Sequence, residues 1–309
     1  MKFLITGGAG YLGSSLCKRL IDGQHEVTVI DNLMYGQATS LFPVAGSKYF
    51  KYVHGDVRNT DLIIKLGKEA DVIIPLACLV GAPLCNNNPL DAKAINTDHI
   101  IELSKLGKKL IYPTTNSGYG VGGEEECTEE SPLNPLSVYG TTKVEAENHL
   151  LSNNSGVCFR LATVFGASPR QRLDLLVNDF VVKAKRDGCI VLFEEHFRRN
   201  YIHVNDVCKA FMFAVYNYDK MVGEAYNVGL SSANLTKRQL AEKVKEHLPN
   251  TVIISSEIGK DPDKRDYLVS NKKLEALGWL PEYSLDDGIK EICKVYDMVK
   301  GSGDIYRNY

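Results

Sequence analysis

The sequence predicts an α/β protein with a doubly wound parallel sheet and a smaller α+β lobe in its C-terminal half. Over the first half of the chain, short apolar runs alternate with segments whose apolar residues recur at helical spacing. This pattern is typical of parallel strands covered by helices. Beyond Gly166 the alternation becomes less regular. We therefore expect a first domain over residues 1–166, to which 200–230 return, and a lobe over 167–199 and 231–309.

The expected strands of the first domain are short apolar runs that end near a glycine, an acid or a small polar residue. They are Lys2–Ile5, Val27–Asp31, Tyr49–His54, Ala70–Ala77, Lys109–Thr115 and Gly156–Thr163. The helices expected between them are Ser14–Ile21, Asp61–Lys68, Pro89–Leu106 and Val138–Leu151. Later in the chain we expect strands at Ile190–Phe193 and Arg199–Val204, and helices at Leu173–Arg186, Val204–Tyr218, Thr236–Leu248 and Leu285–Met298. Thr236 and Gln239 have the spacing of a helix capping box.

Composition indicates an ordinary globular protein of 309 residues, 44% of them apolar and 24% charged. The formal net charge of −2 gives no electrostatic reason to expect nucleic acid or an anionic membrane as a partner. No apolar run approaches the roughly 20 residues that span a bilayer, and no signal-peptide pattern precedes the first strand. We expect a cytoplasmic protein. The eight cysteines include no C-x-x-C pair, which predicts buried thiols and no metal site.

The strongest local motif lies between the first expected strand and the first helix, where Thr6–Gly13 reads T-G-G-A-G-Y-L-G. Gly7 would permit the tight turn, Gly10 the approach of a pyrophosphate to the backbone, and Gly13 close packing of the helix on the sheet. Asp31 ends the second strand, where a carboxylate can accept hydrogen bonds from an adenosine ribose and would repel a 2′-phosphate. The alternative is an ordinary glycine-rich turn, but the strand–turn–helix–strand context favours NAD.

Further residues at expected strand ends or in the glycine turn are candidates for the same cofactor site. Asp56, after the third strand, could accept from the exocyclic amine of adenine, and the small apolar end of the fourth strand suits a position beneath the cofactor. With the glycines and Asp31, the expected NAD contacts are Tyr11, Leu12, Asn32, Asp56, Val57, Leu76, Ala77, Tyr139 and Lys143.

The candidate catalytic residues are Tyr139, Lys143 and Thr115. Tyr139 and Lys143 are four residues apart and would lie on one helix face. A nearby ammonium favours the phenolate form, so Lys143 is expected to lower the pKa of Tyr139 and make it a general base toward an alcohol. Thr115, at a strand end, would orient that alcohol. The alternative is an ordinary helix pair, which the glycine motif upstream makes the weaker interpretation.

These motifs together resemble the extended short-chain dehydrogenase/reductase family, the nucleotide-sugar epimerases and dehydratases. The resemblance covers nearly the whole chain and continues through Arg199–Val204, Arg265–Asp266 and Leu277–Pro281. It implies a Rossmann fold, NAD and a nucleotide-sugar substrate. It also implies that Arg199 and Arg265 contact the substrate's diphosphate or ribose, a role that suits guanidinium groups, with Asn178 nearby. The substrate contacts expected in this way are Val80, Asn116, Ser117, Thr163, Asn178, Arg199 and Arg265. Surface salt bridging is the alternative for the two arginines.

Two positions depart from the sugar 4,6-dehydratases, which carry an acid pair, or at least a glutamate, after the catalytic threonine. Here these positions are Asn116 and Ser117, and neither side chain is an acid or a base near neutral pH. Dehydration is therefore disfavoured, which leaves a 4-epimerase or a C4 dehydrogenase.

Three strings, Pro75–Pro83, Tyr112–Gly120 and Phe193–Tyr201, are similar to the GDP-heptose 4-dehydrogenase subgroup of bacterial capsule biosynthesis. That resemblance implies oxidation of GDP-D-glycero-α-D-manno-heptose to its 4-keto form. A protein that binds the dinucleotide without catalysis is the remote alternative, because such proteins tend to lose the tyrosine and lysine.

The family resemblance also implies a homodimer formed through two long helices, here around residues 95–106 and 138–151. Apolar side chains that could lie on the exposed faces of these helices are Ile100, Leu103, Leu150 and Leu151. Burial in the core of a single chain would explain these residues equally well.

Overall fold

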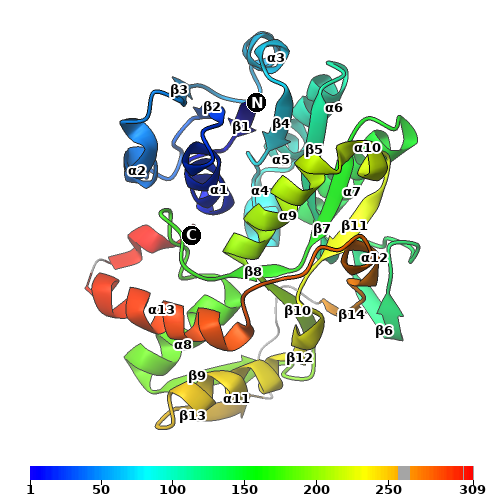
Figure 1. Ribbon diagram of the computed structural model, residues 1–309. Helices are drawn as coiled ribbons and strands as arrows, with labels where there is room; N and C mark the ends of the chain where they lie inside the picture. Colours follow the sequence, from blue (N-terminus) through cyan, green and yellow to red (C-terminus); the bar gives the residue numbers. More distant parts are fainter. Residues whose placement is uncertain (257–264, 302, 309) are drawn as a thin grey trace.

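The computed structural model describes residues 1–256, 265–301 and 303–308. Its largest element is a parallel sheet of seven strands in the order β3-β2-β1-β4-β5-β7-β11 (Figure 1). The strands are β1 (Lys2–Thr6), β2 (Glu26–Asp31), β3 (Phe50–His54), β4 (Val72–Pro75), β5 (Lys109–Thr115), β7 (Val157–Leu161) and β11 (Ala225–Val228). The strand order reverses direction between β1 and β4, and ligands bind at such switch points in open α/β sheets. The predicted fold class is confirmed.

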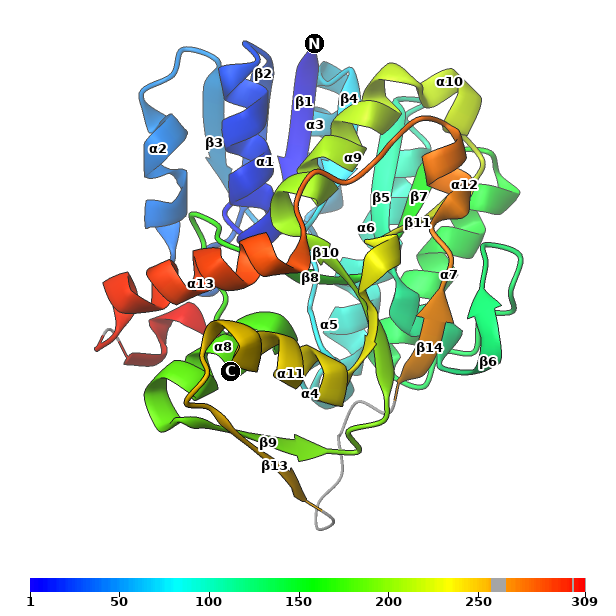
Figure 2. The ribbon, with the colours of Figure 1, turned by 60° about the horizontal axis from the view of Figure 1, so that its bottom comes forward.

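Helices cover both faces of this sheet (Figure 2). One face packs against α1 (Tyr11–Asp22) and α9 (Val204–Tyr216), whose apolar residues share a core with β1, β2 and β7. The other face packs against α3 (Thr60–Glu69), α6 (His99–Ser104) and α7 (Val138–Ser152). The helix expected over Pro89–Leu106 is present, but a π-helical turn, Ala94–Asp98, separates α5 (Pro89–Lys93) from α6.

The lobe has its own apolar core, formed mainly by three helices and two short sheets. The helices are α8 (Leu176–Asp187), α11 (Lys237–His247) and α13 (Leu285–Val299). The sheets pair β8 (Thr163–Phe165), β10 (Arg198–His203) and β12 (Asn234–Thr236), and β9 (Cys189–Phe193) with β13 (Val252–Ser256). The capping box of Thr236 and Gln239 is confirmed at the start of α11.

Strands that the sequence did not indicate include β11, and β6 (Val121–Cys127) paired with β14 (Asp266–Val269). The segment of β6 holds two glycines and three glutamates, so it lacks the apolar alternation by which strands are recognised. The range 231–309 also does not belong wholly to the lobe, because Leu274 and Trp279 are buried in the core of the large sheet. The segment that contains these two residues therefore packs beside β11, before α13 begins.

The apolar residues proposed for a dimer face are mostly inside this chain. Ile100, Leu103 and Leu150 are 0%, 1% and 0% exposed, and all three pack in the core beneath α6 and α7. Of the two explanations left open, burial in the core of a single chain holds for these three residues. The homodimer stays a prediction that these residues do not support. Within the described ranges, no helix is long and apolar enough to cross a membrane.

Candidate active site

A cavity of about 580 Å³ opens at the carboxyl ends of the parallel strands and extends to the lobe. Its lining includes all the predicted cofactor residues and all three predicted catalytic residues. Of the predicted substrate contacts, Val80, Ser117, Thr163, Arg199 and Arg265 line it. Asn116 and Asn178 do not appear in its wall. The topology thus brings together residues separated by more than half of the chain.

The glycine turn has the crowding that its proposed roles require. Gly7 has a φ of +69°, and a Cβ built there would lie 2.6 Å from the backbone nitrogen of Ala77. A Cβ on Gly13 would lie 2.4 Å from the carbonyl oxygen of Gly7, at the contact between α1 and the turn. A Cβ on Gly10 would meet only that same carbonyl, at 3.1 Å. Gly7 and Gly13 are therefore needed for packing, whereas Gly10 leaves its outer side open for a ligand.

Asp31 is held by the backbone with part of its acceptor capacity unused. Its Oδ2 accepts from the Ala9 N–H at 2.9 Å and its Oδ1 from the Leu33 N–H at 2.8 Å. An ionised carboxylate can accept about four hydrogen bonds, so two positions remain for a ribose diol. The carboxylate lines the cavity at the end of β2, beside β1.

Asp56 lines the cavity after β3, as expected, but its carboxylate is already hydrogen-bonded within the protein. Its carboxylate accepts from the backbone N–H, Nε and Nη2 of Arg58 and from Nδ2 of Asn32, at 2.7–3.2 Å. These hydrogen bonds from Arg58 lower the pKa of Asp56 to about 2. Since four donors use its acceptor positions, Asp56 shapes the turn beside Val57 and does not present an unused acceptor to adenine.

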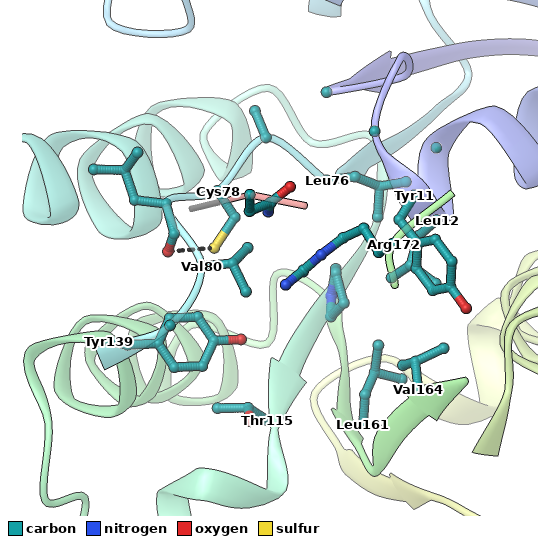
Figure 3. A pocket seen from close by; sticks show the side chains of 18 of the residues that line it. Tyr11, Leu12, Leu76, Cys78, Val80, Thr115, Tyr139, Leu161, Val164 and Arg172 are labelled. Atoms are coloured by element: carbon teal, nitrogen blue, oxygen red, sulfur yellow. Dashed lines mark hydrogen bonds between the residues drawn. The ribbon is translucent and has the colours of Figure 1, made fainter. Parts of the chain in front are cut away.

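Tyr139 and Lys143 lie on the face of α7 that borders the cavity. Figure 3 shows the ring of Tyr139 directed into the cavity, with Thr115 and Val80 on either side of its hydroxyl. Lys143 is 4% exposed, and its Nζ lies 4.2 Å from the centroid of the Tyr112 ring. Burial lowers the pKa of Lys143, because the low-dielectric surroundings disfavour the charged ammonium form.

The pKa of Tyr139 does not follow the simple expectation. Burial raises it above the ordinary value, the Cys78 thiol also raises it, and the positive charge of Arg265 and a hydrogen bond with Thr115 lower it. The largest favourable charge acting on the phenolate is therefore that of Arg265. The lowering of this pKa by Lys143 stays a prediction.

Thr115, Ser117 and Arg265 form a hydrogen-bonded chain beside Tyr139. The Thr115 hydroxyl donates to the Ser117 hydroxyl at 2.9 Å and accepts from the Ser117 N–H at 3.1 Å. Nη1 of Arg265 donates to the same Ser117 hydroxyl. Thr115 thus caps the turn η3 (Asn116–Tyr119) and stays fixed in direction, as a residue that orients an alcohol must be.

Two predicted substrate residues are not at the cavity surface. Asn178 is 0% exposed; its Oδ1 accepts from the Gly166 N–H at 3.2 Å and its Nδ2 donates to the Arg172 carbonyl at 2.8 Å. It fixes the loop between β8 and α8, so its expected contact with substrate is not supported. Asn116 is 1% exposed, and its amide has no hydrogen-bond partner in the described part of the chain. Arg199 is in the wall, 3% exposed, with its guanidinium over the Tyr267 ring.

Several cavity residues were not predicted from the sequence, among them Tyr35, Arg170 and Arg172. Cys78 also lines the cavity, directly after Leu76 and Ala77 at the small apolar strand end that was expected beneath the cofactor. Arg172 extends into the cavity from the wall opposite Tyr139 (Figure 3) and pairs with Asp174. The loop that carries Arg170 and Arg172 has no periodic pattern, and only the fold brings it over α1. The described residues hold no cluster of three or more His, Cys, Asp or Glu placed for a metal ion.

The crowded glycine turn and the two open acceptor positions of Asp31 fit a dinucleotide at this site. Comparison with known proteins agrees. The profile of the NAD dependent epimerase/dehydratase family matches residues 3–229. A putative UDP-glucose 4-epimerase of Methanocaldococcus jannaschii is 26% identical over 303 residues, which cover 94% of this chain and 96% of the relative. A dTDP-glucose 4,6-dehydratase of Streptomyces niveus is 26% identical over 317 residues, covering 96% and 93%.

Among solved structures, the UDP-glucose 4-epimerase of Thermotoga maritima with UDP-glucose is similar with a TM-score of 0.84. It is 23% identical, and the match covers 97% of this chain and 99% of that one, which shows a shared fold. The fold and the site thus define a dinucleotide-binding α/β enzyme. The chain belongs to the NAD dependent epimerase/dehydratase family, part of the extended short-chain dehydrogenases/reductases, and its cofactor is NAD.

Proposed function

We propose that the protein oxidises the C4 hydroxyl of a nucleotide-activated sugar and releases the 4-keto sugar. The substrate that we favour is GDP-D-glycero-α-D-manno-heptose, and the role is in capsular or surface polysaccharide biosynthesis. The relatives support the nucleotide-sugar class, since their names refer to UDP- and dTDP-sugars. The choice of a GDP-linked heptose rests on the resemblance of three sequence strings and is the finer part of the proposal.

The observation that carries the proposal is that the described residues provide no available acid beside Thr115. The carboxylates in the described cavity lining are Asp31, Asp56, Asp174 and Asp179. Asp56, Asp174 and Asp179 are paired with Arg58, Arg172 and Lys183, and Asp31 is held by backbone N–H groups at the end of β2. The turn after Thr115 carries Asn116 and Ser117 instead. Elimination of water needs a group that removes the C5 proton and one that protonates the leaving hydroxyl, and this turn supplies neither.

The residues present suit oxidation of an alcohol. NAD, when bound, accepts the hydride. Tyr139 as phenolate takes the hydroxyl proton, and the positive charge of Arg265 favours that phenolate. Thr115 orients the alcohol, and Lys143, buried between α7 and β5, binds the nicotinamide ribose. Arg199 and Arg265 hold the diphosphate with their planar guanidinium groups.

A 4-epimerase is the second candidate, because relatives with that printed name match along nearly the whole chain. The same tyrosine, lysine and threonine would serve an epimerase. The two reactions differ in whether the keto sugar is released or rotates within the site and is reduced on its other face. A non-catalytic dinucleotide-binding protein is disfavoured, since Tyr139, Lys143 and Thr115 all line the cavity.

The test is incubation with GDP-, UDP- and dTDP-linked sugars, including the GDP-heptose, followed by mass spectrometry and NMR of the product. We expect a ketone two hydrogens lighter than the substrate, or the hydrate of that ketone, which is one water heavier than the ketone. Product formation should stop after one equivalent unless an oxidant regenerates NAD. A diastereomer of unchanged mass would establish the epimerase, and a product lighter by one water would overturn the argument from Asn116 and Ser117.

A further inference from the structure

Arg170 is a buried cation in the cavity wall with no carboxylate partner in the described part of the chain. It lies in the loop between β8 and α8 and is 2% exposed. Its Nη1 donates to the Gln171 carbonyl at 3.1 Å, and its Nη2 is buried with no protein acceptor among the described residues. The nearby carboxylate of Asp174 is paired with Arg172. Burying a guanidinium raises the free energy of the folded state unless hydrogen-bond acceptors or an anion compensate for the lost water. The position of Arg170 therefore points to an anionic ligand.

The position of Arg170 indicates which anion. Its backbone N–H donates to the Ser14 hydroxyl at 3.2 Å, in the first turn of α1. The Ser168 hydroxyl donates to the Tyr11 carbonyl at 2.7 Å and fixes the same loop there. The guanidinium carbon of Arg170 lies 5.1 Å from the ring centroid of Tyr35, which is four residues after Asp31. Arg170 therefore spans the helix N-terminus that faces a diphosphate and the loop that follows the ribose-binding acid.

Two further polar atoms at this end of the cavity are buried without a partner in the described ranges. They are the Tyr35 hydroxyl and Oδ1 of Asn308, and both residues line the cavity. The chain end that carries Asn308 is anchored on both sides: the Gln37 side chain donates to the Ile305 carbonyl, and the Leu173 N–H donates to the Tyr306 carbonyl at 2.8 Å. Arg170, Tyr35 and Asn308 thus provide three polar groups without a partner in the described ranges, from three segments that line the same cavity.

We infer that Arg170, Tyr35 and Asn308 form an outer half of the NAD site that encloses the cofactor diphosphate opposite the N-terminus of α1. The guanidinium and the Tyr35 hydroxyl donate to diphosphate oxygens, and Oδ1 of Asn308 accepts from a ribose hydroxyl. Residues 305–308 then lie at this end of the cavity, so we expect the bound cofactor to leave slowly. The inference rests on the NAD cofactor and is independent of the identity of the sugar.

The diphosphate of the nucleotide sugar has the same chemistry, and the experiment separates the two. Arg170→Gln keeps the polarity and removes the charge. Its matched control is Arg186→Gln, which alters an exposed arginine paired with Asp187 on α8. For each purified holoenzyme, release of NADH is followed by its fluorescence after mixing with excess NAD, and GDP affinity is measured by calorimetry on the same samples.

We expect Arg170→Gln to speed NADH release about tenfold to a hundredfold, the range of a lost hydrogen bond to a charged group. GDP affinity should stay unchanged, and Arg186→Gln should match the wild type in both measurements. Tyr35→Phe and Asn308→Ala, which remove single polar groups, should speed release severalfold even if the Arg170 variant folds poorly. Unchanged release in all three variants, or a loss of GDP affinity with unchanged NADH release, would overturn the inference.

Discussion

The two ends of the cavity are built in different ways. At the cofactor end, the backbone of a single β1–α1 turn sets the geometry, and a methyl group added at Gly7 or Gly13 would meet backbone atoms within 2.6 Å. At the sugar end, side chains set it: Thr115, Ser117 and Arg265 join segments up to 148 residues apart through hydroxyl and guanidinium groups. We therefore expect added side-chain volume to disrupt the cofactor end. At the sugar end, we expect the loss of a functional group to have the larger effect.

The largest effect is expected at the sugar end from Tyr139→Phe. Removing the hydroxyl removes the general base, which typically contributes about 10²- to 10⁴-fold to the rate. We expect turnover to fall by that factor while NAD still copurifies with the protein. Tyr216→Phe, at a 66% exposed tyrosine, is the control and should be unchanged. Robust residual oxidation in Tyr139→Phe would remove the assignment of the base.

The next effect is expected from Arg199→Gln in the wall of the same end. The loss of a charged donor to the substrate diphosphate should raise KM about tenfold to a hundredfold, with NADH release unaffected. The adjacent Arg198 pairs with Asp266 at 2.8 Å, so Arg198→Gln tests whether any change in β10 has this effect. Equal changes in KM for both variants would show that Arg199 acts through the strand and not through substrate.

Gly7→Ala and Gly10→Ala test how the cofactor end responds to an added methyl group. At Gly7 the added methyl meets Ala77 and the backbone is left-handed, so we expect about 1–3 kcal/mol lower unfolding free energy as well as loss of NAD. At Gly10 the methyl meets little protein, so NAD affinity should fall with a smaller change in stability. Urea unfolding and NAD titration of both variants give the comparison. Equal destabilisation would contradict the distinct roles of the two glycines.

The smallest effect is expected from pH. Burial and, to a smaller extent, the positive charge of Lys143 together lower the pKa of His99 from 6.5 to about 3. The folded state keeps His99 neutral, whereas the unfolded chain gains a proton below pH 6.5. Stability should therefore be fully present above that pH and fall on acidification, by about 1.4 kcal/mol at a pH one unit below 6.5. Urea unfolding at about pH 7.5 and about pH 5.5 should show this loss in the wild type and a smaller one in His99→Gln.

The same contrast explains what the sequence alone could predict. The glycine turn, Asp31 and the Tyr139–Lys143 pair are local patterns with fixed spacing, and the structure places all of them in one cavity. Asn178 and Asp56 were misjudged because their hydrogen-bond partners, the Gly166 loop and Arg58, decide what their side chains can still bind. Arg170 and Asn308 were missed because they come from irregular segments that reach the cavity only through the fold. The pKa of Tyr139 likewise depends on Arg265, which is 126 residues further along the chain.

The fate of the hydride taken from C4 tests the central claim most directly. A GDP-heptose deuterated at C4 is mixed with the holoenzyme, and both sugar and nicotinamide are examined by mass spectrometry after one turnover. The account predicts that deuterium stays on the nicotinamide and that the sugar is recovered as a 4-keto compound without deuterium. Deuterium returned to C4 of a diastereomeric sugar would contradict the release of the keto sugar and establish the epimerase.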